Sequence, residues 1–409
     1  MDDRRKRFDR RTLLTGAAGL AGLGVSVAAV GAGGRLPLPG PPGSEVTFGD
    51  ETVGFHGERQ AGVATTPQAH AAFVGLDLAP GVDATTLAGV LQVWTEDASR
   101  LTRGEPALAD SEPELARIPA RLTVTVALGP GAFDAAGRSA ARPGWLRPLP
   151  AYAIDRLDDR WGQTDLLLQI CADDPVTVAH ATRVLCANVR GRIVLRWVQR
   201  GFRNARRSQD GSVTMRNLMG QVDGTVNPGS AEHDSLLFDD GGRQPWFGGG
   251  TGMVLRRIAM NLDSWQELDP PAQELTVGRS IATGAPLGGR HEHDVPDFTA
   301  VHDGLPVIPA GSHVARAHRR TDREQFLRRA YNYDDPPEPD ADGVLPTSNS
   351  GLLFTAFARD LDEQYLPVQQ RLAEHDALNE WTTPIGSAVY AVLPGARPGR
   401  PLGASLLER

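Results

Sequence analysis

Asp223 stands between two glycines in the stretch Gly-Gln-Val-Asp-Gly-Thr-Val-Asn-Pro at 220–228. Gly220 and Gly224 allow backbone angles that other residues rarely adopt, and they let the chain approach a bulky group closely. We therefore expect Asp223 to sit on a turn whose backbone aims its carboxylate. An Asp-Gly pair on its own is more often an ordinary turn than a catalytic one. Its chemistry depends on what lies downstream.

A histidine and an arginine follow that could act with this carboxylate. His313 lies in Gly-Ser-His-Val at 311–314, and Arg328 comes fifteen residues later in Leu-Arg-Arg-Ala-Tyr-Asn-Tyr at 327–333. A neutral imidazole is a common axial ligand of haem iron. An acid, a histidine and an arginine in this order suggest a haem site. His313 would bind iron on one face, while Asp223 and Arg328 would face peroxide on the other.

In their shared order, these motifs resemble those of the dye-decolourising (DyP-type) haem peroxidases, most of all the exported subgroup. Further matches are Gln-Ala-Gly at 60–62 with Thr-Pro at 66–67, Thr-Gly-Ala-Pro-Leu-Gly-Gly at 283–289 and Gly-Leu-Leu-Phe at 351–354. The resemblance runs from about residue 56 to the C-terminus. It implies an enzyme that uses haem b (iron protoporphyrin IX) to reduce hydrogen peroxide. Dyes, phenols or other bulky one-electron donors would be oxidised through a ferryl intermediate.

The resemblance also implies roles for single residues. Asp223 would move a proton between the two peroxide oxygens, which implies an acidic pH optimum. Arg328 would act as a fixed cation while the O–O bond breaks, and His313 would bind the metal. Leu352 and Phe354 would line the peroxide side. The cofactor contacts that it implies are His313, Gly220, Gly224, Thr225, Arg279 (toward a haem propionate), Thr283, Arg329, Leu352 and Phe354.

Alternatives remain open at several of these positions. His318 is the nearest rival of His313 as iron ligand, whereas His291, His293 and His302 lie in a loop-rich stretch and are predicted to be solvated. A surface ion pair is the alternative role for Arg329. A ligating histidine needs an acceptor for its other ring N–H. The candidates are Asp360, Asp362 and Asp376, and the sequence does not choose among them.

Residues 1–34 have the pattern of a twin-arginine export signal. A basic segment ends in Arg10-Arg11, and an uncharged run follows from 12 to 34. The alternative is an uncleaved anchor, because the run approaches the length of a membrane span. We expect the twin-arginine machinery to export the protein to an extracellular, periplasmic or cell-envelope location, with no stable membrane span after cleavage. Residues 35–55 are rich in Pro and Gly and are predicted to be a linker.

The charge of the chain argues against nucleic acid as a partner. The net charge is −8, and because residues 1–32 hold six basic and three acidic residues, the remainder carries −11. An acidic protein does not suit polyanions or anionic membranes. The expected partners are hydrogen peroxide and a reducing small molecule or polymer, with a homo-oligomer as an open option. Cys171 and Cys186 are the only cysteines, and they could form a disulfide or remain two free thiols.

Alternating and amphipathic patterns predict an α+β fold. Strands at 72–78, 122–128, 165–171 and 193–197, with helices at 83–101 and 175–189, give the β-α-β-β-α-β order of a ferredoxin-like unit. The pattern at 165–174 recurs at 351–360, which suggests a second unit with strands at 252–262 and 387–393 and a helix at 363–372. A chance match of two Leu-rich strands is the alternative. We therefore predict two ferredoxin-like domains, at 56–212 and 213–409, whose antiparallel sheets pack together as in a dimeric α+β barrel. The second domain would hold the haem.

Two other functions compete with a peroxidase. An exported protein that handles haem or iron, similar to a deferrochelatase, would exchange its cargo without turnover. A relative that had kept the fold and lost the site would bind no haem, but the presence of Asp223, His313 and Arg328 speaks against it.

Overall fold

The N-terminal half follows the predicted β-α-β-β-α-β order. Asp83 caps the first helix, because its carboxylate accepts a hydrogen bond from the backbone N–H of Thr86 at 2.8 Å. The predicted strands and helices of this half are confirmed with small shifts at their ends, except that the last strand extends to Phe202. The bounds are β1 His70–Leu78, α1 Ala84–Leu101, β2 Thr123–Leu128, α2 Pro130–Ala135, β3 Leu166–Ala172, α3 Pro175–Ala187 and β4 Ile193–Phe202.

The C-terminal half repeats this order with longer insertions. The helix predicted at 363–372 is two helices, since Pro367 in the first turn of the second lacks the N–H that a continuous helix needs. The bounds are α4 His233–Leu236, β5 Thr251–Met260, α5 Leu262–Trp265, α6 Pro270–Val277, β6 Val301–His302, β7 Leu305–Pro306, α7 His313–Ala317, β8 Leu327–Arg328, β9 Tyr331–Asp335, β10 Asn349–Ala358, α8 Leu361–Gln364, α9 Leu366–His375, β11 Thr382–Val392 and α10 Ala404–Leu407.

The strands of both halves belong to one antiparallel sheet. Its order is β5-β11-β2-β3-β1-β4-β9-β10-β8, and β10 also pairs with β5, so eight of the strands close into a ring. Each half contributes four neighbouring strands in the same relative order. The halves meet through short pairings: Ala391 and Val392 pair with β2, and Phe202 pairs with Asn332. The α+β class and the barrel-like arrangement of antiparallel strands are thus confirmed, while the two predicted sheets are two four-stranded halves joined edge to edge in one sheet.

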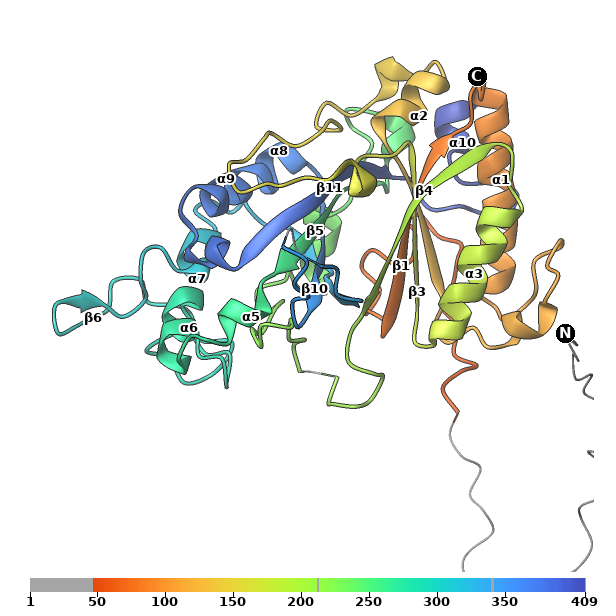
Figure 1. Cartoon of the computed structure of the whole chain (residues 1–409). Helices are drawn as coiled ribbons and strands as arrows, with labels where there is room; N and C mark the ends of the chain where they lie inside the picture. Colours follow the sequence, from red (N-terminus) through yellow and green to blue (C-terminus); the bar gives the residue numbers. More distant parts are fainter. Residues whose placement is uncertain (1–46, 212, 340–341, 409) are drawn as a thin grey trace, which may run out of the picture. The chain divides into compact units, whose positions relative to one another are not determined.

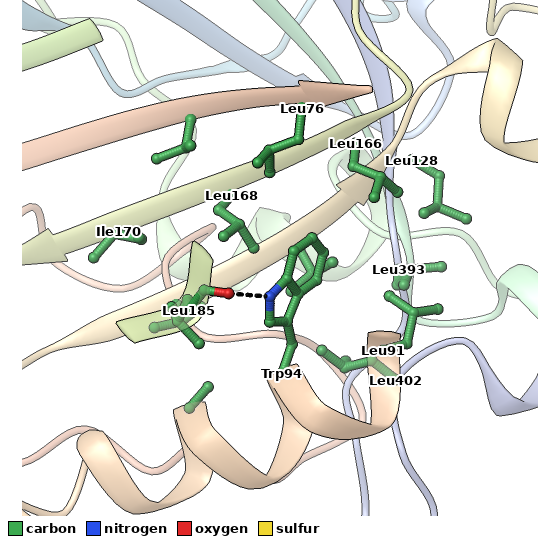
Figure 2. Close-up of a cluster of buried hydrophobic side chains, with 14 of the residues drawn as sticks. Leu76, Leu91, Trp94, Leu128, Leu166, Leu168, Ile170, Leu185, Leu393 and Leu402 are labelled. Atoms are coloured by element: carbon green, nitrogen blue, oxygen red, sulfur yellow. Dashed lines mark hydrogen bonds between the residues drawn. The ribbon is translucent and has the colours of Figure 1, made fainter. Parts of the chain in front are cut away.

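The two faces of this sheet bury different cores. On the outer face of the N-terminal half, α1 and α3 lie side by side against the strands (Figure 1). Trp94 of α1 points into a cluster of leucines from β1, β2 and β3, and its indole N–H donates to the carbonyl of Leu185 at 2.8 Å (Figure 2). The inner face gathers Phe73, Tyr331 and Tyr390 from both halves. The ring of strands is therefore filled by side chains.

The computed structural model describes residues 47–211, 213–339 and 342–408. The predicted signal at 1–34 and the linker up to residue 46 lie outside these residues. The end of the predicted linker packs on the fold, since Phe55 is buried and the N–H groups of Ala120 and Arg121 donate to the carbonyls of Gly49 and Glu51. Folded structure thus begins before residue 56, where the first domain was predicted to start.

Two smaller expectations concern the cysteines and the membrane. Cys171 is buried and Cys186 is half-buried, and both thiols are free, which confirms the second of the two alternatives. Burial raises the pKa of the Cys186 thiol to about 11. Across 47–211, 213–339 and 342–408, no helix has both the length and the apolar character needed to cross a bilayer.

Candidate active site

A hairpin around Gly220 presents Asp223. Arg216 and Val222 form an antiparallel bridge, and Gly220 closes the turn with a φ of 81°. The Asn217 side-chain oxygen accepts from the backbone N–H groups of Met219 and Gln221. The N–H of Asp223 donates to the carbonyl of Met215 at 2.9 Å. The predicted turn is therefore confirmed as a hairpin whose last residue is the acid.

Arg328 on β8 contacts this acid directly. Its Nη1 donates to Asp223 Oδ1 at 3.2 Å, and the two side chains are 21% and 10% exposed. Asn227, which follows Asp223 in the same motif, holds the backbone of Arg328 at both ends. Its Oδ1 accepts from the Arg328 N–H at 2.9 Å, and its Nδ2 donates to the Arg328 carbonyl at 2.8 Å. The motif thus positions the acid and the arginine together.

His313 opens the short helix α7 and is held by one carboxylate. Its Nδ1 lies 2.6 Å from Asp376 Oδ2, and Asp376 also accepts from the backbone N–H of Leu378. Burial alone would lower the pKa of His313, but the negative charge and hydrogen bond of Asp376 outweigh burial and raise this pKa. Asp376 is therefore the acceptor that the sequence left open. Asp360 caps α8, and Asp362 pairs with Arg147.

The predicted residues converge on one region of the C-terminal half. The charges of both Arg328 and Asp223 act on the His313 imidazole, so the three groups share one electrostatic environment. Leu352 of β10 is buried in a cluster with Met219 beside the hairpin and Leu378 beside Asp376. Phe354, two residues along the strand, packs against the edge of the same cluster. Apolar side chains thus surround the polar groups.

The loop at 279–292 packs against the hairpin. Arg279 is buried, and its Nη1 donates to the carbonyls of Gly284 and Glu292 at 2.7 and 2.8 Å. Burial lowers the pKa of Arg279. Glu292 in turn accepts from the hydroxyl of Thr225 at 2.9 Å. Thr283 is an exposed turn residue whose oxygen accepts from the N–H of Ala285. These residues brace the hairpin, and the expected propionate contact of Arg279 stays a prediction.

Arg329 contacts a different part of the molecule from its neighbour Arg328. Arg329 is buried, so it does not form the surface ion pair that was its alternative role. Its guanidinium contacts the Thr65 carbonyl and donates to Gln68 Oε1 at 2.5 Å, which ties β8 to the N-terminal half. This geometry does not support the predicted cofactor contact. The reason is that neighbouring residues on an extended segment point to opposite faces.

The other candidate histidines are exposed. His318 lies at the end of α7, and its ring centre is 4.9 Å from that of Phe298, with the two rings tilted by 55°. His291, His293 and His302 are exposed, as expected for solvated side chains. The choice of His313 over His318 is therefore favoured by burial and by its carboxylate partner.

The residues present fit a haem group. His313 Nδ1 is held by Asp376, whereas Nε2 has no hydrogen-bond partner among the described residues and can bind a metal. In the part of the chain that the structure describes, no group of three or more His, Cys, Asp or Glu could hold a bare metal ion. A single imidazole suits a haem, whose porphyrin supplies the other ligands. The hydroxyl of Ser312, next to His313, is buried without a partner and is a further polar atom for such a group.

Sequence reasoning overlooked two residues that shape the site. Asn227 lies inside the motif at 220–228, but the sequence predicts no role for it. Its amide can both donate and accept, which the two hydrogen bonds to the Arg328 backbone require. Glu292 joins Thr225 to Thr214 across the hairpin. No local signal marks Glu292, because its partners lie 67 and 78 residues away in sequence.

Comparisons with known proteins agree with this geometry. The family models Dyp-type peroxidase, N-terminal, and Dyp-type peroxidase, C-terminal, match residues 60–203 and 214–397. The chain is 36% identical to a dye-decolorizing peroxidase of Thermobifida fusca (strain YX), over 100% of this chain and 99% of that protein. It is 33% identical to a deferrochelatase of Escherichia coli (strain K12), over 88% of each.

Two solved structures extend the comparison. A DyP-type peroxidase from Cellulomonas bogoriensis is 52% identical, with a TM-score of 0.86 over 89% of this chain and 100% of that one. Ferric DtpA from Streptomyces lividans is 37% identical, with a TM-score of 0.83 over 88% of this chain and 98% of that one.

Proposed function

Because this chain belongs to the Dyp-type peroxidase family, we propose that Asp223, Arg328 and His313 carry out its haem-dependent peroxidase reaction. The observation that carries this assignment is the hydrogen bond from Arg328 to Asp223 beside an imidazole held by Asp376. A peroxidase needs an acid–base group, a fixed cation and an iron ligand. These three residues supply one each.

Each residue has a distinct part in the reaction. When bound, haem supplies the iron that accepts oxidising equivalents from peroxide. Asp223 takes the proton from one peroxide oxygen and returns it to the other, which leaves as water. Arg328 stabilises the negative charge that develops as the O–O bond breaks. The Asp376 carboxylate orients the His313 ring and increases its basicity as a ligand. Leu352 and Phe354 exclude water from the reacting oxygens.

An absorption experiment on the purified haem-loaded protein tests this function. We expect one equivalent of hydrogen peroxide to change the haem spectrum within the mixing time of a rapid spectrometer. A reducing dye should then restore the resting spectrum while it is bleached, over many turnovers. A protein that keeps its resting spectrum with peroxide and bleaches no dye would contradict the proposal.

A second function is favoured by one observation, the 33% identity to proteins named deferrochelatase. In that case the haem-loaded protein would release iron and leave free porphyrin. Porphyrin fluorescence measured without peroxide separates the two, because a peroxidase leaves its cofactor intact between turnovers.

We further infer the finer properties that the sequence suggests. The cofactor is haem b, and each half of the sheet is a ferredoxin-like unit that arose by duplication. The shared strand order of the two halves supports the duplication. Export by the twin-arginine machinery to the envelope or the exterior rests on Arg10-Arg11 and the uncharged run that follows. Expression with and without residues 1–34, followed by fractionation, tests the export.

A further inference from the structure

Residues 290–307 form an arm that leaves the fold shortly before α7. Its two ends lie side by side, because a Cβ atom at Gly288 would stand 3.3 Å from the side chain of Val307. Beyond this base the arm carries the two-residue strands β6 and β7, which pair with each other and project away from α6 and α7 (Figure 1). The reaction described above gives the arm no role.

One end of the arm is anchored to the hairpin that presents Asp223. Glu292 Oε1 accepts from the hydroxyls of Thr214 and Thr225 at 2.5 and 2.9 Å, one on each side of the hairpin. The carbonyl of Glu292 also accepts from Arg279 Nη1 at 2.8 Å. Three hydrogen bonds thus hold this end of the arm on the side of the site where the acid lies.

A contact between two exposed rings attaches the arm to the histidine side. Phe298 lies six residues beyond Glu292, and its ring centre is 4.9 Å from that of His318. His318 follows the last residue of α7, the helix that His313 opens. One ring contact is weaker than three hydrogen bonds, of which two are to a carboxylate. The arm therefore connects the two sides of the site, and its histidine end is the easier one to release.

This course places the arm at an edge of the proposed haem site. In that assignment the porphyrin lies between Asp223 and His313, whose side chains are only 10% and 23% exposed. A segment that is attached to both sides must pass along one edge of a group held between them. A haem that enters or leaves at this edge therefore displaces the arm.

The arm can be displaced at little cost. None of the residues 290–307 is buried, and Val295, Val301 and Leu305 are 87%, 64% and 71% exposed. A segment with so few buried apolar contacts opens at a low free energy. The next residue along the chain, Ile308, is buried and marks where the fixed part of the molecule resumes.

We propose that the arm is the gate through which haem enters and leaves the site. It turns about the anchor at Glu292 and the base at Val307, and it opens where Phe298 parts from His318. The inference rests on the haem site of the proposed function and not on the reaction with peroxide. The arm is closed in the haem-free and in the haem-loaded protein. A weaker contact between Phe298 and His318 therefore speeds entry and release by the same factor and leaves the affinity for haem unchanged.

Rates of haem uptake and release test the gate. Uptake is followed after haem is mixed with the haem-free full-length protein, and release by transfer from the haem-loaded protein to excess apomyoglobin. Phe298→Ala should raise both rate constants roughly threefold to tenfold, the worth of one ring contact. His318→Ala should do the same, and the double variant should add little, because both changes remove one shared contact. Val295→Ala, at an exposed apolar residue of the same arm, is the control and should keep both rates.

A cross-link tests the closed arm. Phe298→Cys/His318→Cys joined by a short bismaleimide should lose nearly all uptake and release. Either single cysteine variant treated with the same reagent should exchange haem freely. The native thiols react slowly with the reagent, since Cys171 is buried and burial raises the pKa of Cys186 to about 11.

Wild-type rates in Phe298→Ala or in the cross-linked protein would overturn the gate, and so would an equal rise in Val295→Ala. Faster release with unchanged uptake would also overturn it, because the ring contact would then stabilise bound haem and not close a path to it. A chain that binds no haem would overturn the proposed function together with the gate. Haem binding with equal rates in all variants would overturn the gate alone.

Discussion

His313 opens the short helix α7 and His318 follows its last residue, yet their surroundings differ in ways that matter for metal binding. His313 has a carboxylate on one ring nitrogen and the other nitrogen available, whereas His318 is exposed against Phe298. A ligating imidazole with a carboxylate partner has a fixed orientation and greater basicity. These differences favour our proposal that His313, and not His318, is the iron ligand.

Replacement of each histidine tests this assignment. His313→Ala should lose the haem spectrum of the wild type and most of the bound haem, because no other ring nitrogen takes its place. His318→Ala, at the C-terminal end of the same helix, should keep both. Haem content and absorption spectra after reconstitution measure the difference. A wild-type spectrum for His313→Ala would transfer the role to another residue.

Arg328 and Arg329 are adjacent in sequence but serve different parts of the molecule. Arg328 donates to Asp223, and Arg329 donates to Gln68. The sequence motif contains both and predicts a catalytic role for Arg328, but nothing in it indicates the contact of Arg329 with Gln68. Which of two neighbouring side chains faces the site depends on how β8 pairs with β10, and β8 is only two residues long. A pairing this short leaves no periodic pattern from which its faces could be predicted.

Arg328→Leu should slow the reaction with peroxide by roughly 10²- to 10³-fold while haem remains bound, because a fixed cation at the breaking bond is lost. Arg320→Leu, an exposed arginine on the same segment, is the control and should react at the wild-type rate. Stopped-flow absorbance at varied peroxide concentration gives both rate constants. Equal rates would remove Arg328 from the mechanism.

At the scale of elements, the site depends on hydrogen bonds between the 215–228 segment and β8. Asn227 makes two hydrogen bonds to the Arg328 backbone, and the hairpin fixes Asp223 on the same segment. The acid, histidine and arginine could be predicted from sequence because their motifs are local. The contact of Asn227 with Arg328 and the identity of Asp376 as the partner of His313 could not be predicted, because both depend on contacts between segments far apart in the chain.

Asn227→Ala should reduce the rate with peroxide by about tenfold or more, because a small misplacement of a catalytic group is costly. Haem binding should change little, since His313 and Asp376 are untouched. Asn349→Ala, at the start of β10, removes an exposed hydrogen bond to the backbone carbonyl of Pro336 and provides the control. A loss of rate in both variants would indicate a general structural effect.

At the scale of the whole molecule, the two halves share a closed sheet. The strands themselves could be predicted, since β1, β2 and β3 have clear alternating or apolar patterns. The pairings that join the halves into a barrel could not, because they involve only Ala391, Val392 and Phe202 with their partners. Such short contacts leave no periodic signal in the sequence. The aromatic residues inside the ring likewise come from both halves.

The packing of α1 on α3 predicts a pH effect on stability. Burial raises the pKa of Asp97, although the hydrogen bond from Asn188 opposes this shift. A carboxyl with a raised pKa binds more protons in the folded state, so it favours folding at low pH and this contribution is lost as pH rises through the folded pKa. Asp97→Asn should therefore raise the unfolding midpoint at pH 8 by about 1–3 °C, with a smaller gain at pH 4.

Glu114→Gln changes an exposed acid that is not among the charges acting on Asp97, so it serves as the control and should shift the midpoint equally little at both pH values. Thermal unfolding followed by circular dichroism provides the measurement. A gain for Asp97→Asn that does not depend on pH would show that the carboxylate is not strained by burial.

The most direct measurement of the central claim is a crystal structure of the haem-loaded protein. We expect the iron bound to His313 Nε2, with Asp376 still on Nδ1 and with Asp223 and Arg328 together on the opposite face of the porphyrin. Iron bound to another side chain, or a porphyrin that leaves Asp223 and His313 on the same face, would contradict the assignment.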